Sequence, residues 1–295
     1  MLTHSFKKQI SVISCRRTQR QDDRHPMTAA SPTSTSPAQP QTPDIAIERS
    51  GHTATVQLCR PPHNFFDLAL ISGLVEAFEA LQADPQCRAI VLAAQGRSFC
   101  AGADFSAPEP VAGERRDPSA LYRQAVRLFA VTKPVVAAVQ GPAVGGGLGL
   151  ALVADFRITC AEARWSANFT RLGFHPGFAL SWTLPRLIGP QKAAWMLYTG
   201  RRITGEEAVR IGLADELVAQ DQVRARAQAL AGEIAASAPI AVESTRASLR
   251  AGLVDAVRAA VEHEAGEQRQ HFQTRDFREG IAATAQRREP VFGRH

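Results

Sequence analysis

The chain has 295 residues, of which 45% are hydrophobic and 21% charged, a composition typical of a globular protein with one large domain or two small ones. Its net charge is +6, but residues 1–43 hold six Lys or Arg against two Asp, so only +2 remains for the rest. That small excess argues against a nucleic-acid-binding face. The sequence contains no run of about 18 or more apolar residues, so no membrane span is predicted.

The five cysteines are odd in number and show neither paired spacing nor the Cys/His spacing of a zinc site. We therefore expect no disulfide framework, no metal site and a reducing, cytoplasmic location. Residues 1–43 combine a basic start with a Ser/Thr/Pro/Ala tract after Met27, which predicts a disordered tail with Met27 as an alternative start. A transit peptide is the other interpretation of the basic part. A signal peptide is not expected, because the apolar segment that it needs is lacking.

The elements expected in the first part of the chain alternate between strands and helices. Residues 45–58 show the alternation of a β-hairpin, and residues 68–83 have apolar positions at helical spacing. A strand over 88–94 follows. A polar loop over 106–118 then leads to a helix over 119–131.

The next strand, 134–140, ends in a glycine-rich turn and is followed by a short strand at 156–160. Beyond residue 190 the pattern is almost wholly helical, with candidates at 191–199, 205–211, 221–237, 240–253 and 255–274. This order predicts an α/β fold with parallel strands, in which a core over 44–200 precedes a helical region over 201–295. Periodicity alone leaves a doubly wound sheet open.

The turn Gly145-Gly146-Gly147 joins a predicted strand to a predicted helix, so unpaired backbone N–H groups are expected there. Such donors can hold an anion or a developing oxyanion, although a tight turn in a packed core gives the same pattern. A second segment, residues 96–105, reads GRSFCAGADF and also follows a predicted strand. Donors from the two loops would then face one carbonyl oxygen.

With these two segments the sequence resembles the crotonase superfamily, also called the enoyl-CoA hydratase/isomerase family. The resemblance runs from about Ile45 to the C-terminus and includes the segments 60–64, 184–189, 198–203 and 208–214. It implies a spiral of ββα turns with a C-terminal helical region that mediates trimerisation. It also implies an acyl-CoA thioester as partner, with coenzyme A as part of the substrate and no other cofactor, and a homotrimer or a dimer of trimers.

Carried over from the family, the two oxyanion-hole N–H donors would be those of Ala103 and Gly146. The same resemblance implies departures at the catalytic positions. Gly149 and Phe169 stand where hydratases carry their two glutamates, and the turn His175-Pro176-Gly177 lacks the aspartate of some isomerases, which would be at Gly177. The acid–base groups known from the family are therefore missing.

Titratable residues near these motifs are the remaining candidates for proton transfer. His175 and Glu114 are the two we select, against the alternatives of a packing histidine and a solvated loop charge. The substrate-binding residues implied by the resemblance are His63, Asn64, Ala101, Gly102, Asp104, Gly145, Phe169, Arg288 and Phe292.

Three functions follow as hypotheses. The first is an acyl-CoA enzyme that stabilises a thioester enolate for hydration, isomerisation or C–C cleavage. The second is a non-catalytic acyl-CoA-binding protein that retains the fold. The third is a hydrolase that cleaves a C–C bond of a β-diketone without coenzyme A.

Overall fold

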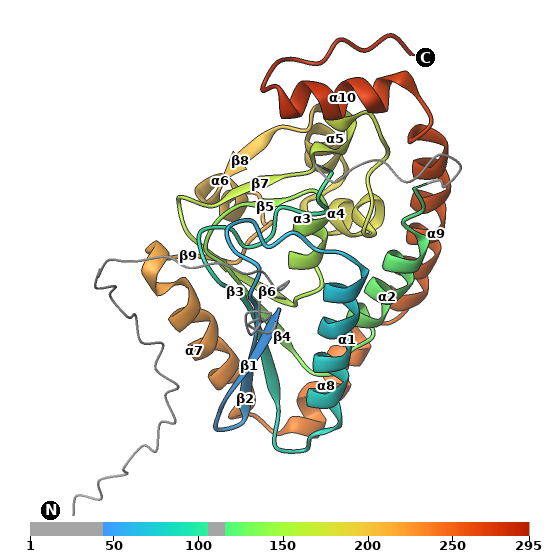
Figure 1. The fold of residues 1–295 in the computed structure, drawn as a ribbon. Helices are drawn as coiled ribbons and strands as arrows, with labels where there is room; N and C mark the ends of the chain where they lie inside the picture. The colour runs from blue at the N-terminus through green and yellow to red at the C-terminus, as the bar shows by residue number, and fades with distance from the viewer. Residues whose placement is uncertain (1–43, 106–115, 295) are drawn as a thin grey trace, which may run out of the picture. The chain divides into compact units, whose positions relative to one another are not determined.

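A six-stranded sheet forms the centre of the structure, a computed structural model that describes residues 44–105 and 116–294 (Figure 1). Its strand order is β1-β2-β3-β4-β6-β9. β1 and β2 form an antiparallel hairpin, and every later pair is parallel. The strands are β1 (Ile45–Ser50), β2 (Thr53–Leu58), β3 (Ala89–Ala94), β4 (Val135–Val139), β6 (Phe156–Thr159) and β9 (Glu216–Leu217).

The two central strands are apolar along their whole length, as expected for parallel strands that are covered on both faces. β3 reads AIVLAA and β4 reads VVAAV, and all but one of their residues are buried. A second sheet, in the order β5-β7-β8, lies beside the glycine-rich turn. Its strands are β5 (Ala143–Val144), β7 (Arg164–Ser166) and β8 (Arg202–Thr204).

Helices cover both faces of the main sheet. α7 packs on β2, β3, β4 and β6, while α1, α2 and α9 lie together on the other side, where α2 packs between α1 and α9 (Figure 1). The helices are α1 (Leu68–Ala83), α2 (Ser119–Phe129), α3 (Gly146–Ala151), α4 (Leu180–Ile188), α5 (Pro190–Thr199), α6 (Gly205–Arg210), α7 (Val223–Ala235), α8 (Pro239–Leu249), α9 (Leu253–His271) and α10 (Arg275–Ala285), with 3₁₀ turns η1 (Asn168–Leu172) and η2 (Gln220–Gln222).

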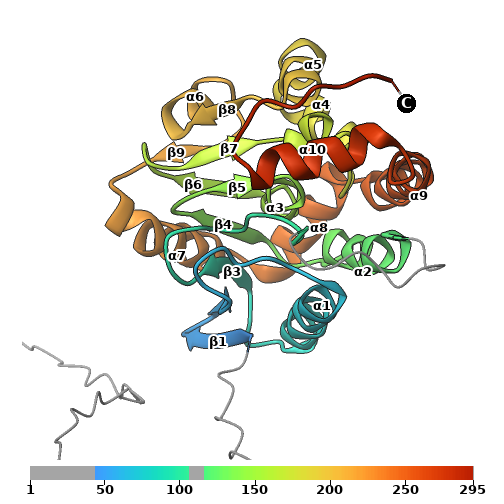
Figure 2. The same cartoon turned by 45° about the horizontal axis from the view of Figure 1, so that its top comes forward.

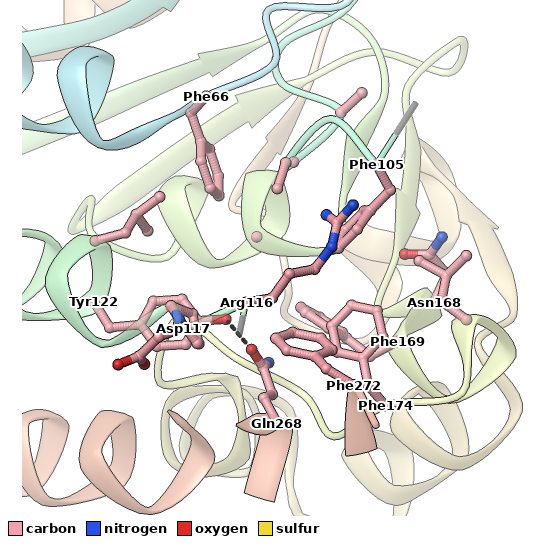
Figure 3. A pocket seen from close by; sticks show the side chains of 18 residues that line it. Phe66, Phe105, Arg116, Asp117, Tyr122, Asn168, Phe169, Phe174, Gln268 and Phe272 are labelled. Atoms are coloured by element: carbon pink, nitrogen blue, oxygen red, sulfur yellow. Dashed lines mark hydrogen bonds between the residues drawn. The ribbon is translucent and has the colours of Figure 1, made fainter. Parts of the chain in front are cut away.

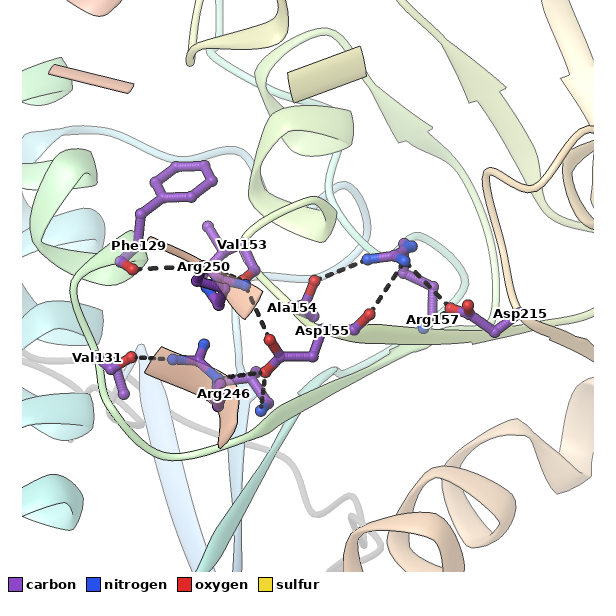
Figure 4. Close-up of polar contacts among 10 residues, drawn as sticks. Phe129, Val131, Val153, Ala154, Asp155, Arg157, Asp215, Arg246 and Arg250 are labelled. Carbon is purple, nitrogen blue, oxygen red and sulfur yellow. Dashed lines mark hydrogen bonds and ion pairs between the residues drawn. The ribbon is translucent and has the colours of Figure 1, made fainter. Parts of the chain in front are cut away.

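A partly buried ionic cluster joins α8 to the sheet (Figure 4). Asp155, just before β6, accepts hydrogen bonds from Arg246 Nε at 2.8 Å and Arg250 Nη1 at 2.9 Å, both from the α8 region, and from Val135 N–H of β4 at 2.8 Å. Arg246 Nη1 also donates to the carbonyl of Val131 at 2.5 Å. Because each charge has partners, the cluster is a structural element rather than a reactive one.

The predicted α/β class and the helical C-terminal part are confirmed. The strand order advances in one direction across the main sheet, so the reversal of order that defines a doubly wound sheet does not occur among the described strands. Two short strands, β8 and β9, interrupt the helices beyond residue 190 and were not predicted. β8 and β9 are strands of two or three residues, too short to give a period-2 signal.

Residues 44–200 and 201–295, predicted as successive regions, belong to one compact unit. α9 of the later region packs on α2 of the earlier one, and Figure 2 shows α9 and α10 beside the elements around the glycine turn. The predicted tail over 1–43 and most of the predicted loop 106–118 lie outside the described residues. No helix in the described ranges is long and apolar enough to cross a membrane.

Candidate active site

A cavity of about 280 Å³ lies where the two predicted loops meet (Figure 3). Ala101, Gly102 and Ala103 of the first loop and Gly145 and Gly146 of the second all line it. The sequence-predicted segments are therefore brought together. Most of the remaining wall is aromatic, formed by Phe66, Phe105, Phe169, Phe174 and Phe272.

Backbone contacts hold the two loops against each other. Val144 N–H donates to the carbonyl of Cys100 at 3.0 Å, and a Cβ atom on Gly147 would lie 2.6 Å from the carbonyl carbon of Cys100. Only glycine allows this approach. Gly102 (φ +88°) and Gly145 (φ +57°) adopt backbone conformations that other residues rarely take. Burial raises the pKa of the Cys100 thiol to about 12, so this side chain packs as a neutral group.

Two backbone N–H groups face this cavity without a protein partner. The neighbouring amides are paired: Gly145 N–H donates to Ser166 O at 2.8 Å, and Phe66 N–H donates to Gly102 O at 2.9 Å. By contrast, the N–H groups of Ala103 and Gly146 have no acceptor within the described parts of the chain. Gly146 is the first residue of α3, so its N–H is one of the donors that a helix leaves free.

Gly149 and Phe169, where the resemblance implies the two glutamates of hydratases, both lie in apolar surroundings. A Cβ atom on Gly149 would lie 2.6 Å from Cβ of Phe178 and 2.8 Å from its ring, so Phe178 occupies the space of a side chain there. Phe169 is 4% exposed and lines the cavity. The structure thus places no carboxylate at either position.

The polar side chains around the cavity are Arg116, Asp117, Tyr122, Asn168 and Gln268, as far as the described residues go. Asp117 accepts from the N–H of Ser119 at 3.0 Å and from its hydroxyl at 2.5 Å. These bonds lower the pKa of the Asp117 carboxyl, so it stays ionised and tied to the start of α2.

Tyr122 and Gln268 form the polar part of the cavity wall between α2 and α9. The Tyr122 hydroxyl donates to Gln268 Oε1 at 3.0 Å (Figure 3), and Gln268 Nε2 donates to the carbonyl of His175 at 2.8 Å. Burial, and then the negative charge of nearby Glu264, raise the pKa of the Tyr122 phenol. Its hydroxyl therefore remains protonated at neutral pH.

Glu264 is a buried carboxyl group behind this wall. It accepts hydrogen bonds from Ala179 N–H at 2.7 Å, Ser181 N–H at 2.9 Å and the Ser181 hydroxyl at 2.6 Å. Burial raises the pKa of Glu264 to about 7 despite these bonds. It fixes the turn that contains Phe178 and Ala179, both at positive φ, at the start of α4.

His175 lies in a different hollow, of about 860 Å³, together with His271. The backbone N–H of His175 donates to His271 Nδ1 at 3.1 Å, and the His175 ring lies 5.6 Å from the ring of His263. Burial, and secondarily His263 and His271, lower the pKa of His175. No three His, Cys, Asp or Glu side chains in the described ranges are arranged to hold a metal. Because the His175 side chain does not line the cavity of Ala103 and Gly146, we do not retain it as the acid–base group there.

The segment expected to contact coenzyme A borders a third hollow, of about 310 Å³, which shares Phe66 with the first cavity. His63 and Asp104 line this hollow. Asn64 does not: its side chain is fully buried, accepts from Arg60 N–H at 3.0 Å and donates to Gln95 O and Ser98 O at 2.8 Å. Its amide shapes the loop instead.

Two other predicted site residues, Arg288 and Phe292, do not line the cavity. Arg288 forms a bidentate ion pair with Glu279 of α10, in which Nη1 and Nη2 donate to Oε1 and Oε2 at 2.5 and 2.8 Å. Phe292 lines the hollow that contains His175. Glu114 lies outside the described residues.

This geometry agrees with the comparison to known proteins. The family model described as enoyl-CoA hydratase/isomerase matches residues 48–295. The chain belongs to the enoyl-CoA hydratase/isomerase family. It is 35% identical over 250 residues to the putative enoyl-CoA hydratase/isomerase YngF of Bacillus subtilis, which covers 83% of this chain and 95% of that protein. It is 33% identical over 253 residues to a crotonyl-CoA hydratase of Syntrophomonas wolfei, with 84% and 97% covered.

Solved structures of the enoyl-CoA hydratase/isomerase family share the fold. An enoyl-CoA hydratase/isomerase from Pseudoalteromonas atlantica superposes with a TM-score of 0.78 at 27% identity, covering 85% of this chain and all of that one. An enoyl-CoA hydratase from Mycobacterium avium gives a TM-score of 0.75 at 25% identity, covering 86% and 100%. The resemblance inferred from the motifs, and the fold that it implies, are thus confirmed.

Tyr122 and Gln268 were not predicted from the sequence as site residues. Tyr122 occupies the buried face of α2 with Ala125, Val126 and Phe129, where it reads as an ordinary core position. The feature that could have identified Tyr122 is its hydroxyl, because a buried tyrosine needs a hydrogen-bond partner. Gln268, 1% exposed in the middle of α9, is the kind of buried polar residue that marks such a partner.

Proposed function

We propose that this protein binds acyl-CoA thioesters and acts on them by holding the thioester oxygen between the N–H groups of Ala103 and Gly146. The observation that supports this most is the pair of unpaired amides on two facing loops in one aromatic-lined cavity. Preorganised N–H donors in an apolar site stabilise the negative charge of an enolate as it develops on the oxygen. Membership of the family favours an acyl-CoA substrate.

In this proposal the third hollow receives the coenzyme A part of the ligand. It adjoins the first cavity at Phe66, so a chain that leaves the oxyanion donors reaches His63 and Asp104. Arg60 also lines it but is already paired with Asp44 at 2.6 Å and Asp67 at 2.9 Å. Because that cation is largely neutralised, we assign the hollow to the uncharged pantetheine or the adenine rather than to a phosphate group.

Ordinary hydration of a short enoyl-CoA is not the reaction we favour. Addition of water needs a base for the water and an acid for the α-carbon. Gly149 and Phe169 supply neither group, and the one carboxylate that lines the cavity in the described chain, Asp117, is bound to Ser119. We therefore propose a reaction through the enolate that does not depend on those two glutamates.

Non-catalytic binding is the second candidate, and the filling of the Gly149 space by Phe178 favours it. Cleavage of a β-diketone gains no support, because the predicted histidine, His175, does not line the cavity.

Calorimetry with coenzyme A, acetyl-CoA and a panel of longer thioesters, followed by turnover assays, tests the proposal. We expect thioesters to bind more tightly than coenzyme A alone. Enzymatic turnover, on the order of 1–10³ per second, separates the enzyme from the binding protein. Equal binding of coenzyme A and every thioester would contradict the use of the cavity by the acyl group.

We also propose that the protein assembles as a trimer or a dimer of trimers, as the family resemblance implies. Trp195 and Tyr198 of α5 are 57% and 78% exposed in the single chain, which is consistent with a covered surface in an oligomer. Light scattering of the purified protein measures the mass directly. A monomer at micromolar concentration would contradict this proposal.

A further inference from the structure

Gly177 stands where some isomerases of the family have an aspartate, and the space of that side chain is filled here by two groups from elsewhere in the chain. A Cβ atom on Gly177 would overlap the Tyr122 hydroxyl and lie 2.6 Å from Gln268 Nε2. Both groups line the cavity of the unpaired amides. A neutral hydrogen-bonding pair thus takes the position of a carboxylate.

The pair has unused hydrogen-bonding capacity. The Tyr122 hydroxyl donates to Gln268 Oε1, so its oxygen lone pairs are available as acceptors. Gln268 Nε2 uses one N–H for the His175 carbonyl, and its second N–H has no acceptor in the described parts of the chain. One acceptor beside one donor matches a ligand hydroxyl, which both donates and accepts.

The position of the pair relative to the amides follows from ring contacts. Phe66 lies against Gly146, since a Cβ atom there would be 2.9 Å from Phe66 Cε1. The Phe66 ring is 5.6 Å from that of Phe178, which is 6.4 Å from that of Tyr122. Tyr122 is thus two ring contacts away from Gly146. A ligand with its carbonyl at Gly146 and its hydroxyl at Tyr122 would extend past Phe66, which also lines the cavity.

The shape and lining of the cavity favour an aromatic body. Phe105 and Phe169 lie 5.3 and 5.4 Å from Phe174 between ring centroids, and Phe272 lies 5.2 Å from it. Such walls offer edge-to-face contacts to another ring. A cavity of about 150 Å³ holds benzene, so about 280 Å³ is enough for a ring and a short acyl arm.

We propose that the acyl group of the substrate carries a hydroxylated aromatic ring, whose hydroxyl is bound by Tyr122 and Gln268. This inference rests on the proposed function, because it assumes that the carbonyl lies at Ala103 and Gly146. It makes Tyr122 a specificity-determining residue that contacts the substrate.

Calorimetry with unreactive saturated thioesters of coenzyme A tests the inference. The ligands are 3-(4-hydroxyphenyl)propanoyl-CoA, its 4-methoxy and unsubstituted analogues, and nonanoyl-CoA, which has the same number of acyl carbons without a ring. We expect the hydroxylated ligand to bind about five- to tenfold more tightly than the unsubstituted one, the gain of a hydrogen-bonded hydroxyl. We expect the unsubstituted ring to bind more tightly than the nonanoyl chain.

Variants then assign the effect to the pair. Tyr122→Phe should reduce the advantage of the hydroxylated ligand to less than twofold while leaving the affinity of the unsubstituted ligand unchanged. The matched control is Tyr198→Phe, which alters the only other tyrosine, one that is 78% exposed and lines the other hollow. It should retain the full advantage. If Tyr122→Phe does not fold, the comparison of the 4-hydroxy and 4-methoxy ligands in the native protein decides the question, since methoxy lacks the donor.

The outcomes separate the inference from the proposed function. Equal affinity for hydroxylated, methoxylated and unsubstituted rings, or an advantage that survives Tyr122→Phe, would overturn the inference while leaving acyl-CoA binding intact. Tighter binding of nonanoyl-CoA than of the unsubstituted phenylpropanoyl ligand would contradict the proposal that the acyl group is aromatic. If no thioester binds more tightly than coenzyme A, the proposed function fails and the inference fails with it.

Discussion

Polar groups are arranged in opposite ways in the Asp155 cluster and in the cavity lined by Ala103 and Gly146. At the cluster, charged side chains are largely withdrawn from solvent, and both carboxylate oxygens of Asp155 are paired with arginines (Figure 4). In the cavity, the wall is mostly aromatic, and two backbone N–H groups are left without protein partners. The charged region therefore stabilises the fold, whereas the unpaired neutral groups point to the site that receives a ligand.

The largest effect is expected on stability when Asp155 is replaced. Asp155→Ala leaves the buried Arg246 and the partly buried Arg250 without their carboxylate, and we expect a loss of about 3–5 kcal/mol in the free energy of unfolding. Asp255→Ala is the control, because that carboxylate is 84% exposed beside Arg258 and should cost less than about 0.5 kcal/mol. Urea unfolding measures both. Equal losses would show that the cluster is not what fastens α8.

Gly146→Ala should impair the cavity with a smaller effect on the fold. The new Cβ atom would collide with the ring of Phe66, so the N–H of residue 146 shifts out of position. We expect catalytic efficiency, kcat/KM, with the best thioester to fall about 10²-fold, the loss typical of one oxyanion donor. Gly232→Ala, on α7 with nothing within 4 Å of the new Cβ atom, is the matched control and should retain activity. Unchanged kcat/KM in Gly146→Ala would show that the N–H of residue 146 does not contribute to catalysis.

Restoring a glutamate at Gly149 should not by itself restore hydration. Gly149→Glu places a Cβ atom 2.6 Å from that of Phe178, so the variant should be less stable and inactive with crotonyl-CoA. The double change Gly149→Glu with Phe178→Gly removes both the Cβ atom and the ring of residue 178, at a positive φ that glycine tolerates, and should recover part of the lost stability. Efficient hydration by the single variant would contradict the steric account of this position.

The effect expected from Glu264 depends on pH. Its pKa is raised in the folded protein to about 7, so its protonated form favours folding below about pH 4.5, and that contribution is lost as the pH rises through 7. The free energy of unfolding should thus fall more between pH 5 and 8 in the native protein than in Glu264→Gln. Glu262→Gln, an exposed neighbour on α9 paired with Arg123, should follow the native curve. Parallel curves for Glu264→Gln would show that burial does not perturb this group.

The sequence predicted the framework of the site better than its chemistry. Long periodic segments such as 68–83 and 88–94 were correctly assigned, and the two glycine-containing loops were expected to meet because each ends a strand of one parallel sheet. α4 and α10 were not predicted. α4 includes Pro185 and begins after the left-handed Ala179, which Glu264 holds from a distant helix. Such a start depends on a tertiary contact, not on a local signal.

The side chains of the site were predicted less well for the same reason. Asn64 was expected to bind substrate, but its side-chain amide already forms three hydrogen bonds with backbone groups of its own and a neighbouring loop. His175 lines the second hollow, where its backbone N–H donates to His271 Nδ1. Tyr122 and Gln268 lie 146 positions apart, so only the packing of α2 on α9 brings them together. Motif spacing carries information on backbone donors but not on such pairs.

Vibrational spectroscopy of a bound thioester tests the central claim most directly. A non-reacting acyl-CoA labelled with ¹³C at the carbonyl reports the strength of the hydrogen bonds at its oxygen through the C=O stretching frequency. If Ala103 and Gly146 hold that oxygen, the band moves to lower frequency when the native protein binds the thioester, and the shift is reduced in Gly146→Ala but retained in Gly232→Ala. A bound thioester whose C=O band stays at its frequency in water would contradict the account.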